Sequence, residues 1–331
     1  MSERGKCVSM KLRPYQVLCL VCSLGESDSW PSDEKLKRVM AAVRENPDMS
    51  ITLVCNAGDV YVYQDPGPAE DTTEGADFNR KRDLDILQKL DLAPGSALPA
   101  RTLFQLVLQQ MPSVAGICGY EVVTAAAWKG CPKAKSGNYE KGQKKGIGAI
   151  VPPRPDAEMA LDKERSLKDM YAADAVAIRP HILLCAVAQY GGGVRPPFKP
   201  DNLPEFIQHI LKRPDTLVTL ATGADWMMCG PCPSRVPNLS ACVCGRIGSG
   251  GLYNEAKDLN TLQVLGLTSG TTMPARDLYR LIFERIPSVA GVCALAGSHP
   301  GTSVWRDGCG AKADPCPNYA KGRVMLMERL K

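Results

Sequence analysis

Two short apolar runs, each separated from a preceding Arg-Pro pair by one or two residues, mark corresponding points in the two halves of the chain. The runs cover residues 17–21 and 182–187, and their composition predicts a buried strand at the start of each half. In the second half, residues 204–212 follow a helix-start signal and predict a helix, and the composition of residues 216–221 predicts another strand. A strand, a helix and a strand over about 40 residues predict a parallel crossover pair.

Helical spacing of apolar residues returns later in the second half, over 258–267 and 274–286, and a charged helix is expected over 157–172. The predicted fold class is therefore α/β, with two tandem copies of a parallel strand-helix-strand unit. Two helices and a cysteine-containing closing segment follow each unit, and an α+β fold is the alternative. The expected divisions are a tail at 1–12, a first repeat at 13–146, a Pro-rich linker with the charged helix at 147–178, and a second repeat at 179–331.

Internal repetition is visible in the sequence itself. Residues 83–118 align without a gap on residues 258–293, and 18 of the 36 positions are identical. We interpret the chain as an internal duplication whose halves pack as a pseudo-twofold pair, like the subunits of a homodimer. Cys229 and Cys232 have no counterparts in the first half. We therefore expect the first repeat to be degenerate and to serve as a packing partner.

Length and composition limit the possible partners. The chain has 331 residues, 44% of them hydrophobic, and no apolar run reaches the roughly 20 residues of a membrane span, so no membrane contact is expected. The net charge of +5 gives little support for a nucleic-acid partner, because no aromatic series accompanies the lysines near 129–145. We expect a cytoplasmic location, where the 14 cysteines stay reduced as thiols or metal ligands; an exported protein would carry disulfides instead.

Four cysteines lie within sixteen residues of the second half. Cys229 and Cys232 form a C-x2-C pair stiffened by proline, and Cys242 and Cys244 form a C-x-C pair whose side chains share one face of an extended segment. Close thiols in this arrangement typically hold a metal. Four thiolates suit both an iron-sulfur cluster and zinc, and the mixed spacing favours the cluster. Zinc is the alternative, and four unliganded thiols are the third possibility.

The second half resembles a family of short bacterial and archaeal proteins of uncharacterised function that are described as iron-sulfur-binding. The resemblance covers most of residues 179–310, and it implies a metal centre but no particular activity. It rests on Arg179, His181, Cys185, Gly223, Asp225, Cys229, Cys232, Pro233, Cys242 or Cys244, Asp258, Cys293, Trp305 and Cys309. The chain departs from the family's closing C-x2-C at Ala296, which leaves several candidate ligands. In descending order of preference as ligands, the candidates are Cys229 and Cys232, Cys242 or Cys244, then Cys309, Cys293 and Cys316.

Three classes of function remain open. The first is a one-cluster redox or electron-transfer protein that meets a protein redox partner, and the second is a zinc-stabilised interaction module. The third is an enzyme with an open iron site near His181 and Asp225. For Asp225 itself we expect a carboxylate that orders the cysteine loop by accepting backbone N–H groups. Packing as small hydrophobic residues within strands is expected for Cys19, Cys22, Cys55 and Cys185.

Overall fold

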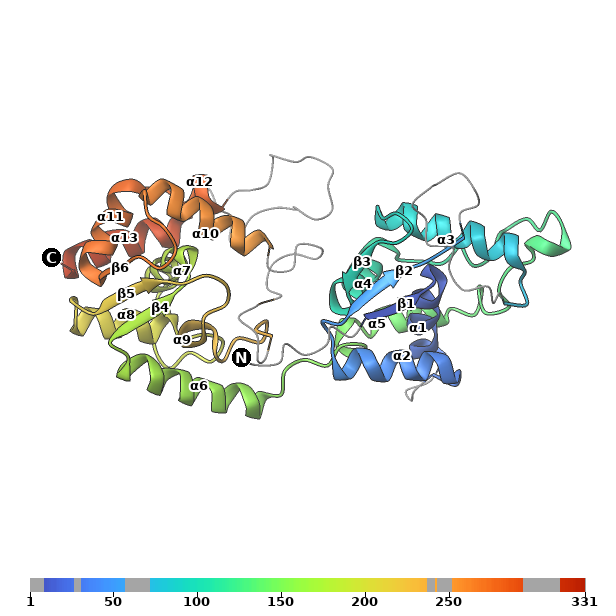
Figure 1. Ribbon diagram of the computed structural model, residues 1–331, viewed down its shortest axis with the longest axis horizontal. Helices are drawn as coiled ribbons and strands as arrows, with labels where there is room; N and C mark the ends of the chain where they lie inside the picture. The colour runs from blue at the N-terminus through green and yellow to red at the C-terminus, as the bar shows by residue number, and fades with distance from the viewer. Residues whose placement is uncertain are drawn as a thin grey trace. The chain divides into compact units, whose positions relative to one another are not determined.

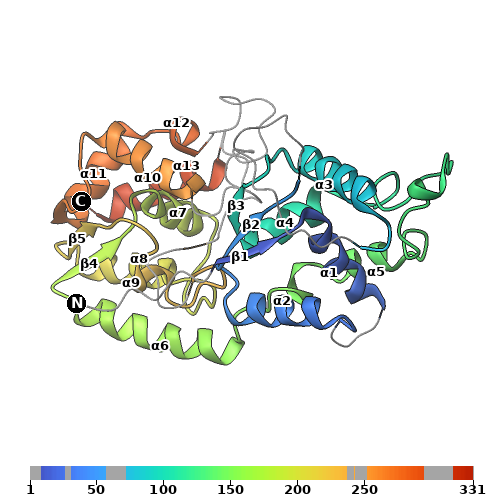
Figure 2. The ribbon, with the colours of Figure 1, turned by 45° about the vertical axis from the view of Figure 1, so that its right-hand side comes forward.

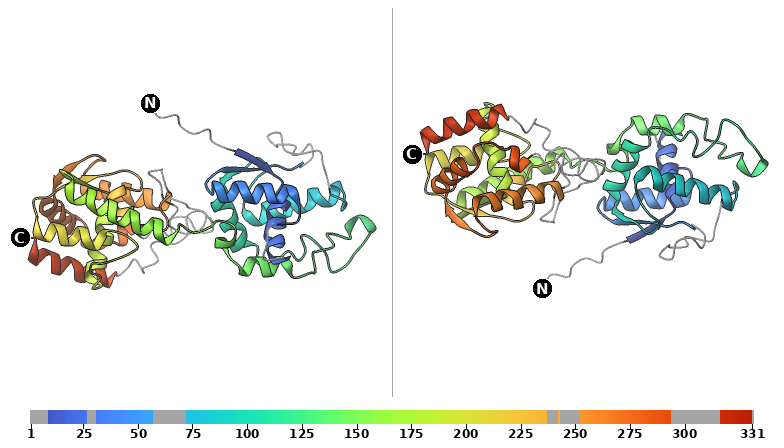
Figure 3. Two further views of the ribbon diagram at one scale, coloured as in Figure 1. Left: turned by 90° about the horizontal axis from the view of Figure 1, so that it is seen from below. Right: turned by 90° about the horizontal axis from the view of Figure 1, so that it is seen from above.

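The computed structural model describes residues 9–26, 31–56, 72–236, 242, 252–293 and 316–330. The chain divides into two compact units, Met1–Pro153 and Arg154–Lys331 (Figure 1). Helices predominate in both units, and each unit contains a three-stranded sheet (Figures 2 and 3). The fold is therefore mixed α/β, as predicted. Among the described residues, no helix combines the length and the apolar character needed to cross a membrane.

The first unit places its strands in the order β1-β2-β3. Strands β1 and β2 pair in parallel with Ser9 opposite Ser50, and β2 pairs with β3 in antiparallel fashion with Ser50 opposite Pro99. In chain order the elements are β1 (Ser9–Leu12), α1 (Pro14–Glu26), α2 (Glu34–Glu45), β2 (Ser50–Leu53), α3 (Ala76–Leu90), β3 (Ala97–Pro99), α4 (Ala100–Gln110), a 3-10 turn (Ala126–Trp128), α5 (Asn138–Lys144) and a second 3-10 turn (Ile147–Ala149).

The second unit has the same strand order and pairing. Strands β4 and β5 are parallel with Ala175 opposite Leu217, and β5 and β6 are antiparallel with Leu217 opposite Pro274. Its elements are α6 (Asp156–Ala172), β4 (Ala175–Ile178), α7 (Pro180–Gly191), α8 (Leu203–Lys212), β5 (Leu217–Leu220), α9 (Trp226–Cys229), α10 (Leu252–Leu265), β6 (Thr272–Pro274), α11 (Ala275–Arg285), α12 (Ala290–Cys293) and α13 (Pro317–Arg329).

Both apolar runs that were predicted to be strands are helical, and those predictions are wrong. Residues 17–21 lie within α1 and residues 182–187 within α7, whereas the first strand of each unit is the short segment before the Arg-Pro pair. Pro14 and Pro180 begin the helices, at a position where a missing N–H is tolerated. Because both helices are buried on most sides, their apolar residues show no helical period.

The other elements expected in the second unit are present. Helices α8 and α11 and strand β5 lie where the sequence places them, α10 begins earlier, at Leu252, and β4 and β5 pair in parallel. The charged helix α6 also forms. It lies within the second unit, together with Arg154 before it, and its side chains Ser166 and Met170 are buried.

Glycines allow one pair of helices in each unit to cross at very close range. A Cβ atom on Gly322 of α13 would overlap the carbonyl group of Val187 in α7, and one on Gly191 would overlap the backbone of α13. Gly25 of α1 and Gly142 of α5 stand in the same relation in the first unit. Only glycine permits two helix backbones to approach so closely.

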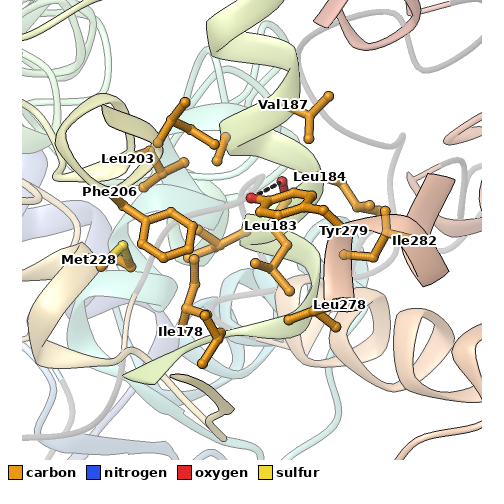
Figure 4. Close-up of a cluster of buried hydrophobic side chains, with 14 of the residues drawn as sticks. Ile178, Leu183, Leu184, Val187, Leu203, Phe206, Met228, Leu278, Tyr279 and Ile282 are labelled. Carbon is orange, nitrogen blue, oxygen red and sulfur yellow. Dashed lines mark hydrogen bonds between the residues drawn. The ribbon is translucent and has the colours of Figure 1, made fainter. Parts of the chain in front are cut away.

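The core of the second unit lies where α7, α8 and α11 meet. Figure 4 shows Leu183 of α7 together with Phe206 of α8 and Tyr279 of α11, all fully buried. The Tyr279 hydroxyl donates to the carbonyl oxygen of Leu183 at 3.4 Å, so the buried hydroxyl keeps a partner. Each buried side chain of this size stabilises the fold by about 1.5–3 kcal/mol. This core fixes the amino end of α7, from which the candidate site is built.

Candidate metal centre

The cysteine loop leaves the sheet after β5 and turns into the short helix α9. Gly223 has a φ of +71°, a left-handed conformation in which a side chain would be strained. Asp225 then caps α9, because its Oδ1 accepts the backbone N–H of Met228 at 2.6 Å. The predicted role of Asp225 in ordering the loop is confirmed. The cap also fixes Cys229, the last residue of α9, close to the end of β5.

The second oxygen of the Asp225 carboxylate is an unusual feature of this loop. The Asp225 side chain is buried, and its Oδ2 has no hydrogen-bond partner within the described part of the chain. Burial raises the pKa of Asp225 to about 7, although the backbone N–H of Met228 opposes the rise. This carboxyl group also contributes to the raised pKa of Cys229, so it lies near that thiol. Asp225 can therefore gain or lose a proton near neutral pH beside the cysteines.

Arg154 holds the loop from the other side. Its Nη1 donates to the carbonyl oxygens of Gly230 and Cys232, at 3.0 and 2.7 Å. Its Nη2 is held in turn by Asp162 at 2.6 Å. The sequence predicted a linker at this position. The contacts show instead that Arg154 orders the backbone between the two cysteines, which is a role that sequence reasoning missed.

Three of the predicted ligands lie near one another. Cys229 and Cys242 are 9% and 8% exposed, and Cys232 is half-buried. Burial raises the pKa of Cys229 well above its usual value, and the thiols of Cys232 and Cys242 add to the rise. Burial also raises the pKa of Cys232, and Cys242 again contributes. A β-bridge between Arg235 and Cys242 fixes the return of the loop. The three sulfur atoms are therefore within electrostatic reach of one another.

A buried arginine connects these thiols to the helices. Arg179, 2% exposed, donates from Nε and Nη2 to Oδ2 of Asp258 at 2.7 and 2.6 Å. Its Nη1 donates to Sγ of Cys242 at 3.3 Å, and Nδ2 of Asn254 lies 3.7 Å from the same sulfur. Oδ1 of Asp258 accepts the backbone N–H of His181 at 3.0 Å. The start of α7, the helix α10 and the cysteine loop are thus joined in one polar network.

His181 belongs to this network as a neutral imidazole. Its Nδ1 lies 2.6 Å from Oδ1 of Asp258. Burial lowers the pKa of His181 to about 4, because the hydrogen bond to Asp258 only partly offsets it and the charges of Lys257 and Arg179 oppose protonation. Burial alone would raise the pKa of Asp258, but His181 and Arg179 outweigh it and the pKa is lowered. His181 therefore has a positioning partner in Asp258, at the first turn of α7.

The first unit repeats the ion pair without the cysteine loop thiols. Nε of Arg13 donates to Oδ2 of Asp83 at 2.8 Å, and Oδ1 of Asp83 accepts the backbone N–H of Tyr15 at 2.9 Å. Tyr15 occupies the place that His181 has in the second unit. The shared Arg–Asp pair therefore fastens the start of α1 to α3 in the first unit and the start of α7 to α10 in the second, and the histidine and the cysteine loop distinguish the second unit.

Of the remaining predicted ligands, two lie in the described part of the chain and two lie outside it. Cys244 and Cys309 lie outside the described residues, as does Trp305. Cys293 ends α12 and Cys316 precedes α13. Both thiols contribute, after burial, to the raised pKa of Tyr319, so they lie near that ring. The structure thus groups Cys293 with Cys316 beside Tyr319.

Within the described ranges, no three His, Cys, Asp or Glu side chains are close enough together to hold a single metal ion. Comparison of the chain with protein-family models, with curated proteins and with solved structures found no match. The candidate centre therefore stands on its own geometry: three gathered thiols, a guanidinium that donates to one of them and a carboxyl group beside another.

Proposed function

We propose that the second unit binds an iron-sulfur cluster through Cys229, Cys232 and Cys242 and acts as a redox or electron-transfer protein. The observation that carries the proposal is the gathering of these thiols next to Arg179, which donates an N–H to Sγ of Cys242. Cysteine thiolates are the usual ligands of iron-sulfur clusters. We expect Cys244 or Cys309 to complete the ligand set, in line with the sequence prediction.

The charges around the thiols fit such a group. Thiolates that ligate iron are negative, and a buried negative charge needs a compensating cation. Arg179 is buried at this position with its charge shared between Asp258 and Cys242. Hydrogen bonds to the sulfurs of a cluster, together with the charge around it, set its reduction potential. A cluster held here would supply single-electron transfer, and Arg179 would favour its more reduced state.

The spacing of the ligands favours a cluster over zinc, the alternative metal. A zinc ion draws four ligands to about 2.0–2.3 Å from one point. A cluster distributes its ligands over several irons, so its thiolates lie farther apart. Among the described side chains no set of three is close enough together to hold a single ion, so the preference for a cluster rests on the mixed sequence spacing, C-x2-C followed by C-x-C.

An enzyme is a second candidate function, and the carboxylate of Asp225 favours it. Its Oδ2 is buried and has no hydrogen-bond partner among the described residues, and the carboxyl group lies near Cys229 with a pKa raised by burial to about 7. Such a group can carry a proton to or from a substrate. In this case Asp225→Asn would abolish turnover of a substrate and leave bound iron unchanged. If Asp225 only orders the loop, Asp225→Asn would both lose bound iron and make the loop less stable.

Metal analysis of two variants tests the main proposal. Protein purified without oxygen is expected to show broad visible absorbance and to contain iron and acid-labile sulfide. Cys232→Ser should lose the iron and sulfide that the cysteine loop binds. Cys55→Ala, which removes a buried thiol of the first unit, should retain the iron and sulfide content of the wild type. Parallel Cys244→Ser and Cys309→Ser variants identify the fourth ligand. Equal iron in the Cys232 and Cys55 variants, or zinc in place of iron, would refute the proposal.

A further inference from the structure

Four cysteines of the first unit line a single cavity. The cavity has a volume of about 230 Å³, and Cys19, Cys22, Cys118 and Cys131 all lie on its wall. All four are free thiols, and they come from three separate segments of the chain. The sequence predicted that Cys19 and Cys22 pack as small hydrophobic residues within a strand, although their C-x2-C spacing is also that of a metal-binding pair. Packing of this kind gives no reason for four thiols to meet at one cavity.

The helix α1 brings two of the thiols to the cavity. Cys19 and Cys22 are three residues apart in α1, which places both on the same face of the helix. Each is only partly exposed, so the face is largely covered by the rest of the unit. In the strand that the sequence predicted here, positions 19 and 22 would point to opposite sides. The observed helix is therefore what allows the two side chains to act together.

A tight loop contact brings the other two thiols together. The backbone N–H of Cys131 donates to the carbonyl oxygen of Cys118 at 2.8 Å. Gly130, directly before Cys131, has a φ of +80°, and a Cβ atom there would lie 2.7 Å from the carbonyl oxygen of Cys118. Only glycine fits this conformation at this distance. The chain between α4 and α5 is thus built so that Cys118 and Cys131 lie next to each other.

A buried arginine, Arg82, lies on the cavity wall, and its charge opposes the rise that burial causes in the pKa of Asp83. Arg82 is 2% exposed and stacks 3.8 Å over the ring of Tyr15. Its Nε has no hydrogen-bond partner and its guanidinium forms no ion pair within the described ranges; Nη2 donates only to the Thr72 hydroxyl, at 3.4 Å. Burying a cation in this way is unfavourable unless a negative charge lies nearby.

The charge of Arg82 acts on two of the thiols, Cys19 and Cys118, so the four cysteines share the cavity with a buried cation. The other cation on the wall, Lys133, is already paired with Glu26 at 2.6 Å. An anionic occupant that deprotonates the thiols would balance Arg82. A metal centre held by four thiolates has this property, because its net charge is negative.

We propose that the first unit holds its own iron-sulfur cluster, ligated by Cys19, Cys22, Cys118 and Cys131. The cavity, with a volume of about 230 Å³, has room for a group larger than a single ion. The proposal shares no residue with the centre of the second unit.

The cluster would also stabilise the segment between α4 and α5, which contains few buried apolar side chains of its own. Between α4 and α5 the chain has no regular element longer than the 3-10 turn Ala126–Trp128, and Val122 and Val123 are exposed. Ligation through Cys118 and Cys131 would tie this segment to α1. Metal binding of this kind contributes directly to folding stability, because the ligands are not assembled in the unfolded chain.

Iron and sulfide analysis in a double-variant design tests the proposal. The full chain is purified without oxygen as wild type, Cys131→Ser, Cys232→Ser and the combination of both. We expect Cys131→Ser to lose about half of the iron and sulfide of the wild type, and the combined variant to lose nearly all. The matched control is Ser23→Ala, which alters the same cavity wall without removing a thiol. Iron in Cys131→Ser equal to that of Ser23→Ala overturns the proposal.

The design also separates this proposal from the proposed function of the second unit. If only the second unit binds iron, Cys232→Ser alone empties the protein; if only the first unit does, Cys131→Ser alone empties it. If Cys131→Ser fails to fold, cysteine alkylation of the wild-type protein tests the proposal instead. Cys22 and Cys131 are partly exposed, so both should alkylate slowly in the metal-loaded protein and rapidly after iron is chelated. Equal alkylation of both in the two states, or zinc at these residues, overturns the proposal.

Discussion

Replacing Asp258 with asparagine tests the polar network that joins the candidate centre to the fold. The carboxylate of Asp258 accepts hydrogen bonds from Nε and Nη2 of Arg179 and from the backbone N–H of His181, and it lies 2.6 Å from Nδ1 of His181. Asp258→Asn keeps the size of the side chain and removes its charge. Arg179 then remains buried without a carboxylate that it can pair with fully.

The loss of stability expected for Asp258→Asn follows from the burial of the Arg179–Asp258 ion pair. Both side chains are at most 5% exposed, so solvent screens their interaction only weakly. Breaking a buried pair by removing one partner destabilises a protein by about 3–5 kcal/mol. The matched control is Asp277→Asn on α11, where the pair with Arg280 is exposed at the surface. Exposed pairs of this kind contribute about 0–1 kcal/mol.

Hydrogen exchange followed by mass spectrometry measures the stability of each unit separately, from the exchange rates of its peptides. A loss of about 3 kcal/mol corresponds to more than a hundredfold faster exchange, since about 1.4 kcal/mol is a factor of ten. We expect this acceleration in peptides from α7 and α10 of Asp258→Asn, with little change in the first unit or in Asp277→Asn. Exchange in α7 and α10 that matches the Asp277 control would refute the assigned role of the network.

Three further predictions follow from single contacts. The pKa of His181 is about 4 in the folded chain and 6.5 in the unfolded reference, so below pH 6.5 the unfolded chain binds a proton that the folded chain does not. The free energy of unfolding of the second unit should therefore fall by about 3 kcal/mol as the pH is lowered from about 6.5 to 4. Urea unfolding should show this pH dependence for the wild type and lack it for His181→Asn. Gly322→Ala should destabilise the crossing of α7 and α13 by about 3 kcal/mol, measured by thermal unfolding, whereas Gly291→Ala, with open space around it, should be nearly neutral. Arg154→Met should speed amide exchange in residues 226–236 at least tenfold because it removes two hydrogen bonds to the loop, while Arg165→Met, an exposed change on the neighbouring helix α6, should not.

The sequence predicts most helices of the second unit well, but it fails for α1 and α7, the helices that follow the two Arg-Pro pairs. Helices α10 and α11 expose one face, so their apolar residues keep a helical period that can be read directly, whereas the start of α8 was predicted from the residues around Pro204. Helices α1 and α7 are buried on most sides and lose that period. Pro14 and Pro180, at positions that suit a helix start, were the signal that could have corrected the interpretation.

The same error hid the thiol cavity of the first unit. Cys19 and Cys22 share a face only if the segment is helical, and the contact between Cys118 and Cys131 depends on the conformation of Gly130. The candidate centre of the second unit was more accessible to prediction, because Cys229 and Cys232 are close in the chain. Its buried partners were harder to identify, since Arg179 and Asp258 are 79 residues apart and meet only through the packing of α7 and α10.

Native mass spectrometry of the anaerobically purified wild-type chain tests most directly whether its gathered thiols bind iron-sulfur clusters. The measured mass is compared with the 35.7 kDa of the polypeptide. We predict an excess that corresponds to iron and sulfide from one cluster in each unit and that disappears after chelation. A mass equal to that of the bare polypeptide, or an excess that corresponds to zinc alone, would contradict the account.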